Sequence, residues 1–166
     1  MNPKEFIEKV FIIETGDIVD RHPYIAFHII SSGIEFLGKC IDKKNQKWNW
    51  DLKYQKENQP FDSAIKQLFP ESYFFLFEKD FNLREELRNG FSHFFAPKIK
   101  IGLFSKKDLI SKNITYNMHP YKTQREQVYL SIEYFYYDFV EACKKVIKMD
   151  FPIGDKMNKK FINIPQ

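Results

Sequence analysis

The residues best suited to chemistry in this chain are a cation and an imidazole five positions apart, Arg88 and His93. Successive residues of a helix step around its axis by about 100°. A helix over 82–95 would therefore bury one apolar arc, formed by Leu83, Leu87, Phe91 and Phe94. The opposite arc would be polar, formed by Glu85, Arg88, Asn89, Ser92 and His93. Such a face is a candidate site for binding or cleaving a phosphodiester.

Metal-free RNA cleavage needs these kinds of side chain. The ribose 2′-hydroxyl attacks the adjacent phosphate, so one group must take its proton and another must protonate the leaving 5′-oxygen. Histidine titrates near neutral pH and can fill either role. Arginine stays charged and presents a fork of donors that matches phosphate oxygens. Asn89 and Ser92 can orient these groups or donate to the phosphate, and Glu85 neighbours Asn89 one turn away.

Helix geometry sets a condition on the site. Five residues turn the helix by about 140° beyond a full turn, so Arg88 and His93 of one straight helix do not easily reach the same phosphate oxygen. A second copy of the helix across a two-fold axis could bring the two residue types together. The spacing therefore favours a homodimer.

Other interpretations stay open at this point. With four histidines in the chain, an arginine and a histidine at this spacing can arise by chance. A helix surface with Glu85, Arg88, Asn89 and Ser92 is often only a solvated face, on which Arg88 pairs with Glu85.

The run from Leu87 to His93 resembles the signature of the HEPN (higher eukaryote and prokaryote nucleotide-binding) family, R-x4-6-H with a polar residue after the arginine. The stretch 32–37 is similar in style to an early helix of that family. The resemblance implies a helical bundle that dimerises with its motif helices facing each other. It implies Arg88 as phosphate ligand, His93 as acid/base and Asn89 as the polar residue beside the arginine.

Many members of that family are metal-independent endoribonucleases of prokaryotic defence or toxin systems, with a protein antitoxin or regulator as partner. The resemblance therefore implies a ribonuclease that needs no cofactor. If RNA binds, the lysines that follow the motif helix are its expected backbone contacts: Lys98, Lys100, Lys106 and Lys107. One alternative is a non-catalytic module that binds a nucleotide or a partner. Another is a helical interaction protein whose motif is coincidental.

The pattern along the chain predicts an all-α bundle of four or five helices. Pro23 opens a helix to about Asp42, in which Gly33 and Gly38 leave room for close packing. Asp62 caps a short helix before Pro70. The run 71–95 reads as helical, restarting at Asn82 with Glu85 as a capping box. A small β-hairpin or a long loop is expected at 98–118. The last helix is predicted to start with the capping box at 123–126 and to end near Met149.

Length and composition favour one domain, at 1–150, followed by a polar tail at 151–166. The formal charge of +4 permits a nucleic-acid partner without demanding one. The charged N-terminus does not resemble a signal peptide, and no apolar run reaches the roughly 20 residues of a membrane span. A cytoplasmic protein without membrane contact is expected. No residues show metal-site spacing, and Cys40 and Cys143 are expected to be buried thiols.

Overall fold

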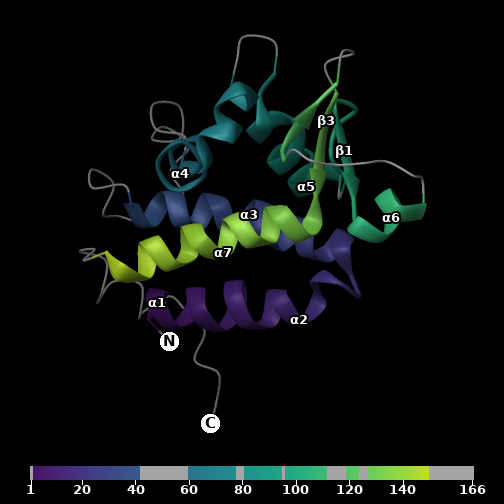
Figure 1. Ribbon diagram of the computed structural model, residues 1–166. Coiled ribbons are helices and arrows are strands. Elements are labelled where there is room, and N and C mark those ends of the chain that lie inside the picture. The colour runs from purple at the N-terminus through teal and green to yellow at the C-terminus, as the bar shows by residue number, and fades with distance from the viewer. Residues whose placement is uncertain are drawn as a thin grey trace.

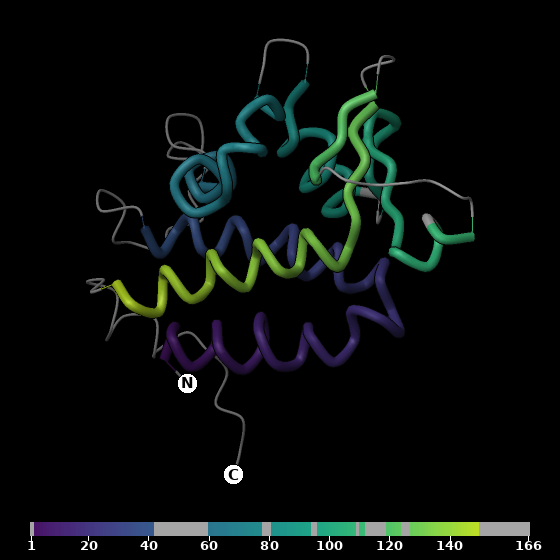
Figure 2. Tube along the Cα trace, in the orientation of Figure 1, coloured from purple at the N-terminus to yellow at the C-terminus, as the bar shows by residue number. Residues whose placement is uncertain are grey.

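The computed structural model describes residues 2–41, 60–77, 81–94, 96–111, 119–123 and 127–149. Three long helical segments pack together. The first runs through α1 (Pro3–Phe6), η1 (Ile7–Glu14, a π-helix) and α2 (Thr15–Val19). The other two are α3 (Pro23–Ile41) and α7 (Ile132–Lys148). In Figures 1 and 2, α7 lies against both α3 and the N-terminal segment, so the ends of the described chain share one bundle.

The N-terminal segment is a helix that the sequence analysis did not predict. It starts with a capping box, in which the Asn2 side chain accepts from the Glu5 N–H and the Glu5 side chain accepts from the Asn2 N–H, both at 2.9 Å. Its buried residues recur every four positions, at Ile7, Phe11, Thr15 and Val19. Asn2, Pro3 and Glu5 could have revealed this start, because proline is favoured in the first turn of a helix.

Helix α3 starts at Pro23 as predicted, and both of its glycines lie at close contacts. A Cβ on Gly33 would meet the Phe139 ring of α7 at 2.5 Å. A Cβ on Gly38 would meet the backbone oxygen of Pro60, where α4 (Pro60–Leu68) begins, at 1.8 Å. Figure 1 shows α4 end-on above α3, so the two helices cross. The expected short helix before Pro70 is α4, but it begins at Pro60, so Asp62 lies in its first turn and the predicted cap at Asp62 is wrong.

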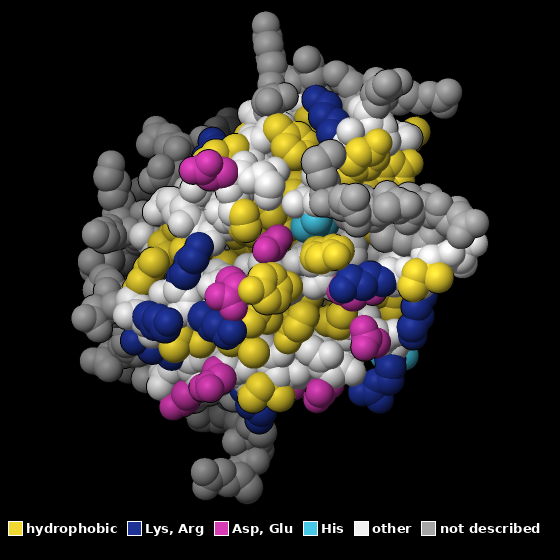
Figure 3. All heavy atoms as spheres, viewed as in Figure 1, with side chains coloured by type: hydrophobic (Ala, Val, Ile, Leu, Met, Phe, Trp, Pro, Cys, Tyr) yellow, Lys and Arg dark blue, Asp and Glu magenta, His cyan; other side chains and the backbone are white. Residues whose placement is uncertain are grey.

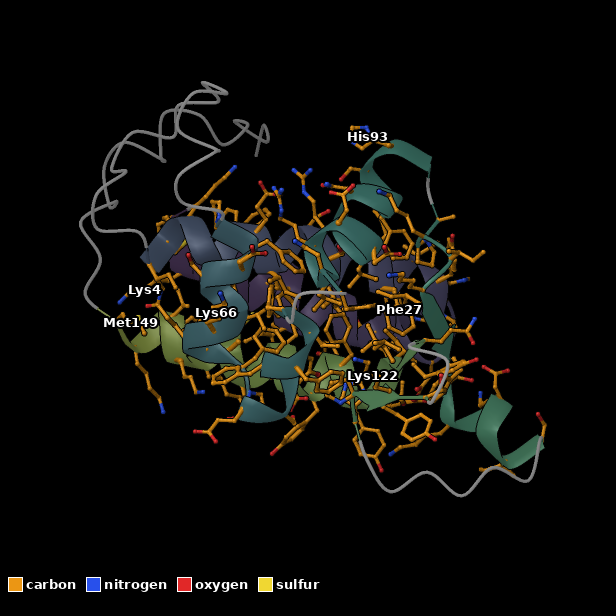
Figure 4. All side chains as sticks on the ribbon, turned by 90° about the horizontal axis from the view of Figure 1, so that it is seen from above. Lys4, Phe27, Lys66, His93, Lys122 and Met149 are labelled. Carbon is orange, nitrogen blue, oxygen red and sulfur yellow. The ribbon has the colours of Figure 1, made fainter. Side chains whose placement is uncertain are left out.

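One cluster of buried hydrophobic residues extends from Ile7 to Val146. At its centre Phe27 of α3 lies 5.9 Å from Phe135 of α7, centroid to centroid. Tyr73 of η2 (Glu71–Phe77, a 3-10 helix) stacks on the same Phe135. Phe27 is labelled at the centre of Figure 4. The described part of the predicted domain thus shares one core; the predicted tail at 151–166 lies outside the described residues.

The expectation of a mostly helical fold is confirmed, with a small mixed sheet as a correction. Its strands are β1 (Ile101–Phe104), β2 (Tyr121–Lys122) and β3 (Val128–Ser131), in the order β1-β3-β2. β1 pairs parallel to β3, and β2 pairs antiparallel to β3. The hairpin is therefore formed by β2 and β3, which lie beyond the stretch 98–118 where a hairpin or a long loop was expected. Of that stretch, β1 and α6 (Lys106–Ser111) are described.

The predicted start of the last helix is wrong. Thr123 donates its N–H to the Gln127 carbonyl at 2.8 Å, and its side-chain oxygen accepts from the Gln127 N–H at 3.2 Å. These bonds close the β2–β3 hairpin, and the helix begins only at Ile132. Residues 128–131 form β3 and pair with β1 instead of starting the helix. Val128 is β-branched and Tyr129 is aromatic, and both types suit a half-buried strand. The predicted apolar positions at Phe135, Phe139, Ala142 and Val146 are buried, while Met149 is 39% exposed.

Among the described helices, α3 alone is long and apolar enough to cross a membrane, and half of that stretch is buried inside the molecule. The core helix of a soluble protein passes the same test, so α3 is weak evidence for a membrane span. Cys40 and Cys143 are buried free thiols, as expected. The face in Figure 3 mixes basic, acidic and hydrophobic side chains, so neither sign of charge dominates it.

Candidate functional site

The motif helix begins where the sequence predicts. Asn82 accepts from the Glu85 N–H at 3.1 Å, which caps a helix that runs through η3 (Arg84–Arg88) into α5 (Asn89–Phe94). The η3 segment is a π-helix, in which the Asn89 N–H donates to the Arg84 carbonyl five residues back. π-helical turns are rare and occur frequently at functional sites.

The two faces of this helix are those that the sequence predicts. Leu83, Leu87 and Phe91 are at most 1% exposed. Arg88 and the other predicted polar residues are half-buried or exposed. The side chain of Phe94 lies outside the described residues.

Arg88 is held by two side chains. Its Nε donates to Glu35 Oε2 of α3 at 2.5 Å, and its terminal nitrogen donates to Asn89 Oδ1 at 3.0 Å. The side chains of Arg88 and Glu35 are 26% and 16% exposed, so the ion pair lies at the edge of the core. Lys39, one turn along α3, lies 3.9 Å from the other Glu35 oxygen.

Asn89 connects this ion pair to a second one. Its amide nitrogen donates to Glu85 Oε2 at 2.5 Å, and Lys98 donates to Glu85 Oε1 at 2.5 Å. A continuous polar chain therefore links α3, the motif helix and the segment after it. Of the predicted supporting residues, Glu85 and Asn89 belong to this chain. Arg88 pairs with Glu35 rather than with Glu85, so the Arg88–Glu85 pairing named in the solvated-face alternative is wrong.

Two side chains of this polar chain, Glu85 and Lys39, have shifted pKa values. The pKa of Glu85 is lowered, because Lys98 and then Asn89 donate hydrogen bonds to its carboxylate. The pKa of Lys39 is also lowered, chiefly because burial disfavours its charged form; Glu35 opposes that shift and Arg88 adds to it.

His93 lies at the other end of the helix. Both Ser92 and His93 are exposed, and Figure 4 shows His93 at the periphery of the molecule, directed away from the core. Arg88 contacts Glu35 and Asn89 rather than His93. One copy of the helix therefore presents the acid/base candidate outward while its arginine is held against α3.

The four predicted lysines fall into two groups. Lys98 and Lys100 lie beside the motif helix, where their backbone N–H groups donate to the Glu86 carbonyl at 2.7 Å and to its carboxylate at 3.4 Å. Lys106 and Lys107 belong to α6, and the Lys106 ammonium lies 4.6 Å from the ring centre of Tyr134 at the start of α7. Only the first pair is placed to extend the polar chain.

Sequence reasoning missed Glu35 and Lys39. Their signal is a pair of opposite charges one helical turn apart in an otherwise apolar helix, which marks the side that meets a polar partner. Sequence alone did not show that this partner is Arg88, 53 positions away.

A second polar cluster joins Tyr73, His119 and Asp138. The Tyr73 hydroxyl lies 2.7 Å from His119 Nε2 and donates to Asp138 Oδ2 at 2.7 Å. The Ser131 N–H donates to His119 Nδ1 at 3.4 Å, so the proton of a neutral ring belongs on Nε2. Burial lowers the pKa of His119 to about 4. This cluster fastens the β2–β3 hairpin to η2 and α7.

Within the described residues, no group of three or more His, Cys, Asp or Glu side chains could hold a metal ion. Comparison with known proteins finds no family that matches the chain, no curated relative and no similar solved structure.

Proposed function

We propose that the protein is a metal-independent endoribonuclease with a HEPN-like site, built by the motif helix and its counterpart in a second copy of the chain. The observation that carries the proposal is the fixed position of Arg88 between Glu35 and Asn89, on the same helix face that ends in the exposed His93. An arginine held by two neighbours is preorganised, so it loses little freedom when it binds a phosphate.

In this proposal each residue has a separate task. Arg88 keeps terminal donors beyond the Nε–H that Glu35 engages, and these can bind the phosphate and stabilise its charge in the transition state. His93 takes the 2′-hydroxyl proton or protonates the leaving 5′-oxygen. Asn89 and Glu85 orient Arg88, and Lys98 lies at the end of the same chain to attract the RNA backbone. Ser92 is an added donor beside His93.

A homodimer would complete the site, since Arg88 and His93 of one copy do not contact each other. The surface beside the motif helix suits such an interface. Tyr24 and Ile25 are 48% and 53% exposed at the start of α3, and the Tyr24 ring packs edge-on against Phe91 with centroids 5.4 Å apart. Exposed apolar groups beside a polar site are typical of subunit interfaces.

The setting proposed for this enzyme is the cytoplasm, in a prokaryotic defence or toxin system with a protein antitoxin or regulator. One observation favours a second candidate function. Glu35 offsets the positive charge of Arg88, which a catalytic site would need to stabilise the transition state. This ion pair therefore favours a non-catalytic module, in which the same polar chain binds a nucleotide or a partner without cleaving it.

Cleavage of mixed RNA by the purified protein in excess EDTA tests the proposal. Wild type should leave 2′,3′-cyclic phosphate ends, and His93→Ala should cleave at least about 100-fold more slowly. The matched control is His22→Ala, which removes another exposed histidine outside the motif. No cleavage by a folded, dimeric wild type would reject the enzyme. Loss of nucleotide binding in Arg88→Ala would then support the binding module.

A further inference from the structure

Two helices on the same side of α3, α4 and the motif helix, carry a buried acceptor and a buried donor that do not bond each other (Figure 1). Asp62 lies in the first turn of α4, and Arg84 begins η3. Among the buried side-chain atoms of the described chain, Asp62 Oδ1 and Arg84 Nε have no hydrogen-bond partner. A buried polar atom without a partner is unfavourable, so this acceptor and this donor mark a place where a bound group can supply both bonds.

The two groups lie near each other and near the proposed phosphate ligand. Burial raises the pKa of the Asp62 carboxyl, and the positive charge of Arg84 opposes that shift. An opposite charge has this effect only at short range. Arg84 also precedes Arg88 by four residues, so both arginines project from the same side of the motif helix, one turn apart. Asp62 and Arg84 are half-buried, which leaves part of each side chain accessible to a ligand.

These positions define the ligand that fits. It presents donors to a carboxylate, acceptors to a guanidinium fork and a phosphate to Arg88, and a nucleotide meets all three conditions. Guanine meets the first two best among the RNA bases. Its N1–H and N2–H lie side by side and match the two oxygens of a carboxylate, while its O6 and N7 match the fork of an arginine. Adenine, cytosine and uracil lack the two adjacent donors.

We propose that Asp62 and Arg84 bind the guanine base of a nucleotide whose phosphate lies on Arg88. This base site rests on the proposed function, because the same Arg88 holds the phosphate, and it names the RNA that the site selects. Asp62 accepts from N1–H and N2–H of the base, and Arg84 donates to O6 and N7. In the non-catalytic module the same contacts give a preference for guanine nucleotides.

Binding of short RNAs that the protein cannot cleave tests this site. Four fluorescein-labelled oligonucleotides carry a central guanine, adenine, cytosine or uracil between uridines, and 2′-O-methyl groups block every attacking hydroxyl. The wild-type chain should bind the guanine RNA at least about tenfold more tightly than each of the other three, measured by fluorescence polarisation.

Two substitutions remove the base contacts and leave the phosphate ligand in place. Asp62→Asn loses the pair of carboxylate oxygens, and Arg84→Lys keeps the charge but loses the fork. Each should abolish the preference for guanine, while binding of the other three RNAs changes little. Because burial disfavours the charged form of Asp62, Asp62→Asn should fold as wild type does. The matched control Glu71→Gln removes an exposed acid at the start of η2 and should keep the preference.

The results distinguish the guanine site from the ribonuclease. Equal binding of all four RNAs by wild type, or a preference that both variants keep, would overturn the guanine site and leave the enzyme to its cleavage assay. No binding of any RNA would overturn the guanine site together with the phosphate site at Arg88. A guanine preference in a protein that leaves RNA uncleaved in EDTA would support the guanine site and reject only the enzyme.

Discussion

Glu35 and Arg88, 53 positions apart in the chain, form the ion pair that joins α3 to the motif helix, with Arg88 Nε 2.5 Å from Glu35 Oε2. Both side chains are mostly removed from solvent, so loss of one partner leaves the other charge poorly solvated. We expect Glu35→Gln and Arg88→Gln each to lower the free energy of unfolding by about 1–2 kcal/mol. Urea denaturation of the two single variants and the double variant measures the coupling.

The coupling is expected to reach about 1 kcal/mol, because each single change removes the same contact. The matched control is Lys144 with Glu141, an exposed pair at 2.8 Å on α7. That pair should show much weaker coupling, because solvent screens two exposed charges. Additive effects at Glu35 and Arg88 would show that the ion pair does not fix the arginine.

Stability should separate His93 from Arg88. His93 is exposed, so His93→Ala is expected to change the free energy of unfolding by no more than about 0.5 kcal/mol. Arg88→Ala should cost more, because it releases both Glu35 and Asn89. Thermal unfolding of both variants, run beside the cleavage assay, measures this. A strongly destabilised His93→Ala would mean that the histidine is structural and that any lost activity reports misfolding.

The Asn82 cap should matter to the helix that carries the site. Asn82→Ala removes the acceptor for the Glu85 N–H and is expected to cost about 1 kcal/mol. Asn82→Asp keeps an acceptor and should cost little. Circular dichroism during urea titration compares the two variants. Equal stability of Asn82→Ala and wild type would show that the cap does not set the start of this helix.

Gly38 should be the least replaceable glycine of α3. In an exposed helix interior, alanine for glycine stabilises by about 1 kcal/mol. At Gly38 the new Cβ would overlap the Pro60 backbone oxygen, and backbone cannot move aside as a side chain can. We expect Gly38→Ala to destabilise by at least about 2 kcal/mol despite its helix propensity. A stabilised variant, measured by thermal unfolding, would contradict the tight α3–α4 crossing.

Sequence predicted the features that depend on local pattern. The start of α3 at Pro23, the Asn82 cap and the buried arc from Leu83 to Phe91 all follow from spacing and capping residues, and all are confirmed. The close approaches at Gly33 and Gly38 were also predictable, since glycine leaves room for a neighbouring helix.

The sequence did not predict the features that depend on pairing between distant parts of the chain. Residues 123–126 carry a helix-start pattern, but the chain from Val128 pairs with β1, more than 20 positions earlier, and the strand prevails. The role of Glu35 likewise depends on a contact across the fold. The first helix does not depend on such distant contacts, because its capping box at Asn2 and Glu5 is a local pattern in the sequence.

The pH dependence of stability should reveal His119. The pKa of His119 in the folded protein is about 4, below the usual value of about 6.5 in an unfolded chain, because burial disfavours the charged ring. The unfolded state therefore binds more protons between these values. The contribution is fully present above about pH 6.5 and is lost as the pH falls through 4. Over that window wild type should lose up to about 3 kcal/mol from this residue.

The matched variant is His119→Gln, whose amide can still donate to the Tyr73 oxygen but does not titrate. Its stability should fall less between pH 6.5 and pH 4 than that of wild type, measured by urea denaturation. Asp138 acts in the opposite sense: burial raises its pKa, so its carboxyl favours the folded state more as the pH falls. Asp138 is present in both proteins, so the difference between them isolates His119. Parallel pH profiles would show that the histidine is not held neutral in the cluster.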